Sequence, residues 1–309
     1  MLNKKELIRE VQLMNIKNLK KLDEVCKKYN IQYWVAYGTL IGTIRHRGFI
    51  PWDDDIDVEM LREDYEKLCK VPVEEWGDEF LFCSAYSEDE RQDKVFGRIF
   101  QKNTKIQSYK DVENWRSRKT GNVWYSSIML DIFIVDRIPD DDKVWKKTYE
   151  EALKLIEQYK PLKLKWVAKD HEPKEMLKEV VKDVRYLSQK GKSRAPWLRL
   201  TDRYMKLIED MPKGKRYGLM CTVDPYKYTY EDIFPLKMMQ YEDMMVPVPA
   251  NYQKMLTDMY GDFLAFPPEE DRYHIQFIYI DFGDGREYVI DPVKGSLGEG
   301  KPAYQHEQK

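Results

Sequence analysis

The sequence predicts an α+β fold, in which a mixed β-sheet with flanking helices is followed by an α-rich C-terminal portion. Two observations lead to this prediction. Short runs of β-branched and aromatic residues recur through the first half of the chain, whereas apolar residues of the second half follow helical spacing between prolines and glycines. With 309 residues, of which 42% are hydrophobic, the chain is long enough to bury a large core.

The first predicted element is an amphipathic helix over residues 3–29, where Asn3 and Glu6 have the spacing of a capping box. The run IQYWVAY at 31–37 then predicts a strand that ends at Gly38. The residues that follow, TLIGTIRHRG, predict a short helix that opens from this glycine. The chain therefore begins as helix, strand, turn and helix.

The remaining elements follow the same two patterns. The further strand candidates are 55–60, 79–84, 94–100 and 127–135. The further helix candidates are 141–160, 173–190, 196–210 and 249–260. We expect a core domain with the N-terminal helix over residues 1–140, an α-rich lobe over 141–295 that completes the substrate site, and a flexible polar tail over 296–309.

Composition argues against several classes of protein. The 52 basic and 54 acidic side chains nearly cancel to a net charge of -2, so no global field attracts nucleic acid. No stretch approaches the roughly 20 apolar residues of a membrane-spanning helix, and the N-terminus is charged from its fourth residue. The cysteines form no Cys-x-x-Cys pair and the histidines no i, i+4 pair. We therefore expect a cytoplasmic protein with reduced thiols.

The stretch GFIPWDDDIDV, at residues 48–58, places four carboxylates in five positions. In a strand, Asp53, Asp55 and Asp57 would point one way, whereas Asp54 and the apolar residues would point the other. Carboxylates this close repel each other unless a cation neutralises them, and oxygen ligands suit Mg²⁺ or Mn²⁺. The stretch therefore predicts a metal site on Asp53, Asp55 and Asp57.

Three other interpretations of these acids remain open. The acids could cap a helix or form a turn after Pro51. A calcium loop matches at the alternate aspartates, but Val58 replaces its glycine and Asp64 replaces its glutamate. A solvated acidic face is the third, although Trp52 and Ile56 argue against it.

A second candidate feature is the turn at Gly38 and Thr39, with Arg45 and His46 shortly after it. Backbone N–H groups at the start of a helix, a hydroxyl and a guanidinium together form a phosphate cradle. We therefore name these four residues as candidates for substrate binding. Taken alone, a Gly-Thr turn is also ordinary loop chemistry.

The third feature is Asp131, an acid in the middle of the apolar run at 128–135. A lone buried carboxylate is costly unless it is paired or binds a metal, so we expect Asp131 to join the same metal site. The alternatives are that it caps a strand or pairs with Arg98. Arg98 is a further candidate for substrate binding.

Three segments, at 37–60, 130–136 and 246–270, resemble the LicD family of phosphotransferases, and the similarity extends over about residues 30–275. The resemblance implies a nucleotidyltransferase-like fold with three functional parts. They are a Gly-Ser/Thr turn, an Asp-x-Asp strand and a third carboxylate on a neighbouring strand, which here correspond to Gly38 and Thr39, Asp55 and Asp57, and Asp131. The sequence departs from the family at Ile134, where proline is frequent.

Bacterial members of this family transfer phosphocholine from CDP-choline to sugars of teichoic acid or lipopolysaccharide precursors, and the animal relatives fukutin and fukutin-related protein transfer ribitol phosphate. The resemblance therefore implies metal-dependent transfer of phosphocholine to a sugar hydroxyl of a teichoic acid or other cell-envelope glycan precursor. The donor would be CDP-choline or a related CDP-alcohol, and we expect the glycan precursor to be lipid-linked. Asp55, Asp57 and Asp131 would be catalytic, with Asp131 accepting the proton of the sugar. Transfer of another polyol phosphate, sugar phosphate or nucleotide, and a non-catalytic nucleotide- or metal-binding regulator, remain alternatives.

Two expectations concern the substrates. Aromatic faces bind quaternary ammonium groups, and the candidates for contact with choline are Trp115, Trp124, Tyr125, Tyr226 and Tyr228. The segment KPLKLKWVAK at 160–169 interleaves lysines with apolar residues, which suits either a peripheral contact with the inner face of a membrane or a solvated basic face.

Overall fold

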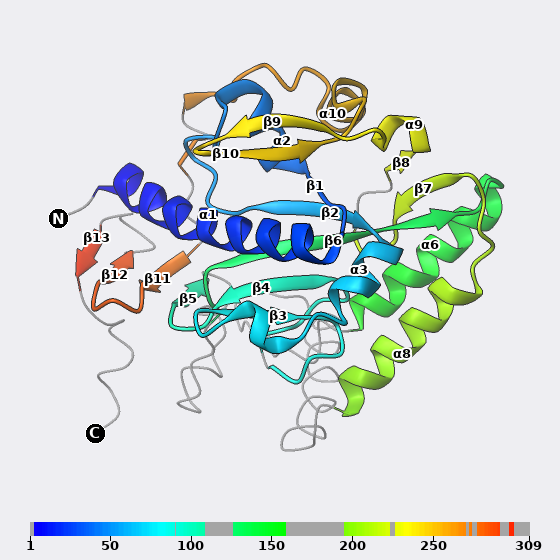
Figure 1. Cartoon of the computed structure of the whole chain (residues 1–309), viewed down its shortest axis with the longest axis horizontal. Helices are drawn as coiled ribbons and strands as arrows, with labels where there is room; N and C mark the ends of the chain where they lie inside the picture. Colours follow the sequence, from blue (N-terminus) through cyan, green and yellow to red (C-terminus); the bar gives the residue numbers. More distant parts are fainter. Residues whose placement is uncertain are drawn as a thin grey trace, which may run out of the picture.

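The computed structural model describes residues 3–89, 91–108, 126–158, 195–222, 226–269, 272–273, 277–290 and 297–299. It confirms the α+β prediction: a twisted mixed sheet lies between helices, and two smaller sheets flank it (Figure 1). The predicted helix at 173–190 and the basic segment at 160–169 lie outside the described residues.

The main sheet carries the strands predicted for the first half of the chain. In spatial order these are β1 (Trp34–Val35), β2 (Asp57–Leu61), β6 (Met129–Ile138), β4 (Gly97–Gln101) and β3 (Phe80–Cys83). Two strands from later in the chain extend it, since β7 (Arg216–Leu219) pairs with β6 and β8 (Lys227–Tyr228) pairs with β7. The β2–β6 pair is parallel and the other pairs are antiparallel.

The smaller sheets are both antiparallel. One is the hairpin of β9 (Lys237–Tyr241) and β10 (Met244–Val248). The other has the order β13 (Leu297–Glu299), β12 (Glu287–Ile290), β11 (Phe277–Asp281) and β5 (Lys105–Ser108). The second half of the chain therefore contributes strands as well as helices, and part of the predicted flexible tail forms β13.

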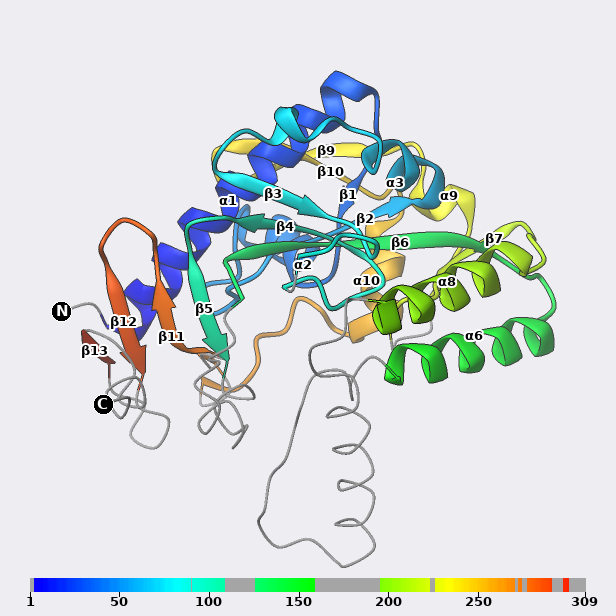
Figure 2. The same cartoon turned by 90° about the horizontal axis from the view of Figure 1, so that it is seen from below.

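Two helices cover one face of the main sheet, as seen in Figure 2: α1 (Lys4–Tyr29) and α3 (Arg62–Leu68). The other helices are α2 (Tyr37–His46), α6 (Asp142–Glu157), α8 (Ala195–Asp210), α9 (Tyr230–Ile233) and α10 (Tyr252–Tyr260), with a 3-10 turn, η1 (Val73–Trp76). The predicted capping box of α1 is formed, because Asn3 and Glu6 each accept a hydrogen bond from the other's backbone N–H. Among the described helices, none combines the length and apolar character that a membrane span requires.

One hydrophobic core extends across the boundary that the sequence suggested at residue 140. Its buried side chains include Leu22 of α1, Ile132 of β6 and Leu256 of α10. Because β7 also hydrogen-bonds to β6, the ranges 1–140 and 141–295 share both a sheet and a core. A second cluster, around Leu7 and Phe277, packs the N-terminal end of α1 against the outer sheet.

Candidate active site

The acidic stretch occupies the loop that precedes β2, which we call the acid loop (residues 50–56), and the first residue of that strand. Two buried amide side chains of α1 hold this loop. Gln12 donates from Nε2 to the carbonyl oxygens of Ile50 (3.1 Å) and Asp53 (2.7 Å), and Asn15 donates from Nδ2 to that of Asp54 (2.8 Å). The loop runs into a strand and not a helix, so its acids cap no helix.

The parallel pairing of β2 with β6 brings the two separate acidic signals together. Asp57 is the register partner of Asp131, and the backbone N–H of Asp131 donates to the carbonyl of Ile56 at 3.0 Å. Register partners on parallel strands point to the same face of the sheet. The two carboxylates therefore lie side by side on the face opposite α1, while Val58 and Ile132 fill the core beneath them.

A pocket of about 320 Å³ opens on this face. Its floor and walls come from five parts of the chain: the acid loop with β2, the start of α2, β6, and two later segments. The lining residues are Tyr37, Gly38, Asp53, Asp55, Asp57, Phe133, Thr222 and Tyr260. The first five belong to the segment at 37–60, and Phe133 and Tyr260 belong to the two later segments that carry the family resemblance. Phe133, Thr222 and Tyr260 were not singled out from the sequence as site residues.

Gly38 is required because the acid loop approaches α2 closely. A Cβ atom at this position would lie 2.3 Å from Oδ2 of Asp53, which is shorter than any non-bonded contact between carbon and oxygen. The turn itself is made by Tyr37, whose φ of 48° places it in the left-handed region that few residues with side chains adopt. Gly38 thus allows close approach within the first turn of the helix and does not form the preceding turn.

Thr39 contributes by fixing Asp57. It is buried, and its Oγ1 accepts a hydrogen bond of 2.9 Å from the backbone N–H of Asp57. The hydroxyl of Thr39 therefore joins the start of α2 to the start of β2, and it does not line the pocket.

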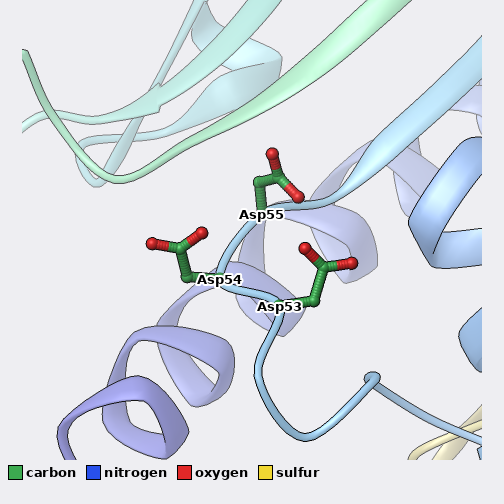
Figure 3. Close-up of side chains that lie close together, drawn as sticks. All are labelled: Asp53, Asp54 and Asp55. Carbon is green, nitrogen blue, oxygen red and sulfur yellow. The ribbon is translucent and has the colours of Figure 1, made fainter. Parts of the chain in front are cut away.

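Three carboxylates of the acid loop are close enough to share a cation. One oxygen from each of Asp53, Asp54 and Asp55 lies within 4.8 Å of the others, and Figure 3 shows the three side chains projecting from one turn of the loop. Asp54 was expected to point away from the others. Because residues 53–56 are not in a strand, strict alternation does not apply to them.

The electrostatics of these acids are unfavourable in the absence of a cation. Burial and the charges of Asp55 and Asp54 raise the pKa of Asp53 to about 9, and burial and Asp55 raise that of Asp54 to about 7. Burial, followed by the charges of Asp55, Asp131 and Asp53, raises the pKa of Asp57 well above its usual range. The pocket thus concentrates negative charge that its neighbours do not neutralise.

Within the described parts of the chain, Asp131 is the one member of this group of acids with a basic partner. Arg98, its register partner on β4, donates from Nε to Oδ1 of Asp131 at 2.8 Å and from Nη1 to Asp93 at 2.6 Å. The side chain of Arg98 is almost fully buried, with 6% of its surface exposed. Arg98 therefore orients Asp131 from the neighbouring strand on the same face of the sheet. The pairing of Asp131 with Arg98, which the sequence left open, thus occurs together with the proximity of Asp131 to Asp57.

The structure places Arg45 and His46 apart from the pocket, in the last turn of α2. Arg45 donates to the carbonyls of Phe263 (3.1 Å) and Ala265 (2.7 Å). The ring of His46 meets the rings of Trp52 and Phe266 at centroid distances of 6.2 and 5.6 Å. Arg45 and His46 thus belong to a cluster of aromatic and basic side chains at the C-terminal end of α2, which includes Trp52 of the acid loop.

A further buried carboxylate was not identified from the sequence. Glu59 of β2 is 1% exposed, faces the same side as Asp57, and accepts a hydrogen bond of 2.8 Å from Nε1 of Trp34. Tyr228, a candidate for contact with choline, donates to Glu59 at 3.4 Å and is itself buried, so it packs behind the pocket wall. The candidates Trp115, Trp124 and Tyr125 lie outside the described residues.

Comparison with known proteins supports the resemblance. The family model described as LicD/FKTN/FKRP, nucleotidyltransferase domain, matches residues 30–151. Lipopolysaccharide cholinephosphotransferase LicD of Haemophilus influenzae is 30% identical over 285 residues, which cover 90% of this chain and 99% of that protein. The uncharacterized protein RP689 of Rickettsia prowazekii is 48% identical over 53 residues, or 17% of this chain and 20% of that one. Asp57 lines the pocket, and Asp131 is its register partner on the neighbouring strand. Because the H. influenzae relative is matched over nearly its whole length, this chain belongs to the LicD family.

Proposed function

We propose that this phosphotransferase transfers phosphocholine from CDP-choline, or a related CDP-alcohol, to a sugar hydroxyl of a teichoic acid or other cell-envelope glycan precursor, and that the reaction depends on a metal ion. The observation that supports the proposal most is the register of Asp57 with Asp131, which joins the acid loop and β6 in one pocket. The matched relative from H. influenzae is a lipopolysaccharide cholinephosphotransferase, which favours choline as the alcohol.

The donor set of the pocket fits Mg²⁺ or Mn²⁺. Every charged group in its lining is a carboxylate, and the raised pKa values of Asp53 and Asp57 reflect repulsion that a divalent cation would relieve. We propose Asp53, Asp55, Asp57 and Asp131 as the residues that hold it. Bound there, the ion would supply positive charge to the pyrophosphate of the donor.

The protein's own groups bind the phosphates and accept the proton. The first N–H groups of α2 are uncapped by any side chain, because Ala36 occupies the N-cap, and Gly38 leaves the first turn open to the pocket. Arg98 engages Oδ1 of Asp131, whereas Oδ2 has no hydrogen-bond partner among the described residues. We therefore propose Oδ2 of Asp131 as the acceptor of the sugar proton.

The proposal includes the place of the reaction. We propose that the protein is cytoplasmic and makes peripheral contact with the inner face of the membrane, where it would bind a lipid-linked glycan precursor. No partner beyond the donor and the glycan is required.

Release of CMP from CDP-choline tests the proposal. The purified protein should release CMP in the presence of Mg²⁺ and an acceptor glycan, and EDTA should stop the release. Asp55→Asn should abolish turnover while the protein stays folded, and an Asp55→Asn enzyme with normal turnover would contradict the scheme. A non-catalytic regulator would instead be stabilised by CDP-choline without releasing CMP, and a panel of CDP-alcohols in the same thermal assay identifies the donor.

A further inference from the structure

Two arginines from distant parts of the chain contact one aromatic ring beside the acid loop. The guanidinium carbon of Arg45 lies 4.6 Å from the ring centroid of Phe266, and that of Arg272 lies 5.4 Å from the same centroid. Arg272 also lies 4.9 Å from the ring centroid of Trp52, a residue of the acid loop. Their distances to the shared centroid place the two guanidinium carbons within about 10 Å of each other.

Neither guanidinium has a carboxylate partner among the described residues. Arg45 donates to the carbonyls of Phe263 and Ala265, and Arg272 donates from Nε and Nη2 to that of Pro267. Nη2 of Arg45 and Nη1 of Arg272 make no hydrogen bond within the described parts of the chain, so each guanidinium keeps one nitrogen that can donate.

The contrast with other partly buried arginines shows that this arrangement is unusual for this protein. Arg62 pairs with Asp136, and Arg98 pairs with both Asp93 and Asp131. For Arg45, burial and then the like charge of Arg272 lower the pKa below its ordinary value. Two adjacent cations without a counter-charge are stabilised by an anion that contacts both.

Aromatic rings are also typical of sites for the quaternary ammonium of choline, but the charges here argue against such a site. Cation–π recognition needs aromatic faces free of other cations. Here Arg45 and Arg272 already lie over Phe266, and Lys5 lies 4.8 Å from the ring centroid of the neighbouring Tyr273. The cluster therefore repels a cationic ligand and favours an anionic one.

The chain connects the cluster to the pocket at two places. Trp52 directly precedes Asp53, which lines the pocket. Tyr260, another lining residue, ends α10, and Phe266 follows six residues later. Arg45 and Arg272 are both partly exposed, and Phe266 is 54% exposed, so a ligand can reach the cluster from solvent.

We propose that Arg45 and Arg272 form a second phosphate-binding site beside the acid loop. This site holds a phosphate group of one of the two substrates while the acidic pocket holds the reacting phosphate. That this phosphate belongs to a substrate rests on the proposed function. Its source is either the cytidine side of the donor or a phosphate of the glycan precursor, and the kinetic test separates the two.

Binding of a simple anion tests the site without turnover. In EDTA the acidic pocket holds no metal and repels anions. A rise in melting temperature caused by inorganic pyrophosphate, measured at constant ionic strength, therefore indicates binding to the two arginines. We expect pyrophosphate to raise the melting temperature of the wild type and of Arg47→Gln, but not of Arg272→Gln. Arg47 is a matched control, because it is exposed, adjoins the same helix end, and loses the same charge on substitution. Equal stabilisation of the two variants, or no stabilisation of the wild type, would overturn the proposal.

Kinetics then assign the phosphate to a substrate. In Arg272→Gln we expect the KM for one substrate to rise about tenfold or more with a smaller change in kcat, since a charge-assisted contact is lost. A rise for CDP-choline assigns the donor phosphate, and a rise for the glycan assigns the acceptor. The KM should also depend less on salt than in the wild type, which a purely structural role of Arg272 would not produce. A wild type that releases no CMP would refute the proposed function, whereas the pyrophosphate measurement would still decide the site.

Discussion

Replacement of Gln12 by methionine would test how the acid loop is held. Gln12 is 2% exposed, and its Nε2 donates to the carbonyls of Ile50 and Asp53. Nη1 of Arg9 donates to Oε1 of Gln12 at 3.0 Å, which turns the amide nitrogen toward the loop. Methionine has nearly the same shape but no amide, so the change removes both hydrogen bonds to the loop and leaves the packing of α1 in place. It also removes the hydrogen bond from Arg9, which keeps Glu242 as its partner.

The cost can be worked out bond by bond. The carbonyl of Ile50 also accepts from the N–H of Asp53, so it keeps a partner and loses about 1 kcal/mol. The carbonyl of Asp53 has no other partner among the described residues, and an unpaired, partly buried carbonyl costs about 1–3 kcal/mol. We expect the free energy of unfolding to fall by about 2–4 kcal/mol, with the loop displaced from its place beside Gly38.

The matched control is Gln101→Met. Gln101 is also buried, and its Nε2 donates to a carbonyl of α1, that of Met14 at 2.6 Å, but it does not contact the acid loop. Urea denaturation should show a smaller loss of stability for Gln101→Met, of about 1 kcal/mol. Release of CMP should fall about tenfold or more only in Gln12→Met, because misplaced carboxylates lose catalytic alignment. If Gln12→Met turned over as fast as Gln101→Met, α1 would not be positioning the site.

Three further perturbations address the pocket and its support. Asp57→Asn should lower transfer about a thousandfold or more. The same change should raise the melting temperature in EDTA because it removes a repelling charge, and a melting temperature below that of the wild type would contradict this. Gly38→Ala places a Cβ 2.3 Å from Oδ2 of Asp53, so CMP release should fall about tenfold while calorimetry shows little loss of stability, since a side-chain end can move aside. Hydrogen bonding from Arg9 lowers the pKa of Glu242, so this pair stabilises the fold above the unfolded pKa of about 4.3 and stops doing so as the pH falls through the lower folded pKa. The stability difference between wild type and Glu242→Gln should therefore be largest near neutral pH and close on acidification, and a difference independent of pH would rule the linkage out.

The parts of the site that could be predicted are those that depend on neighbouring residues in the sequence. An acidic run directly before an apolar strand, and an aspartate inside an apolar strand, are visible in the sequence because the charged residues are unfavourable next to apolar ones. Asp57 and Asp131 were predicted to meet on this ground, and the register of β2 with β6 brings them together. Gly38 was singled out as part of a turn, whereas the structure places the turn at Tyr37 and shows Asp53 in close approach to Gly38.

The parts that could not be predicted depend on contacts between distant segments. Arg272 lies far along the chain from Arg45, and only the fold places both against Phe266. Strand β7 was not predicted because its four residues, RYGL, carry neither clear alternation nor an apolar run. Tertiary pairing with β6 decides its conformation.

The polar residues Gln12 and Asn15 of α1 show how the fold can hold a repulsive site without weakening it. Cationic partners would stabilise the acid loop more strongly, but they would also neutralise the charge that a metal requires. Neutral amides bind the loop through its backbone carbonyls and leave the carboxylates uncompensated. Each amide is fixed by a donor at its own oxygen, Arg9 for Gln12 and Asn18 for Asn15, so each amide nitrogen must face the loop. We infer that α1 is polar at these buried positions because the acid loop is held through its backbone carbonyls and not through its carboxylates.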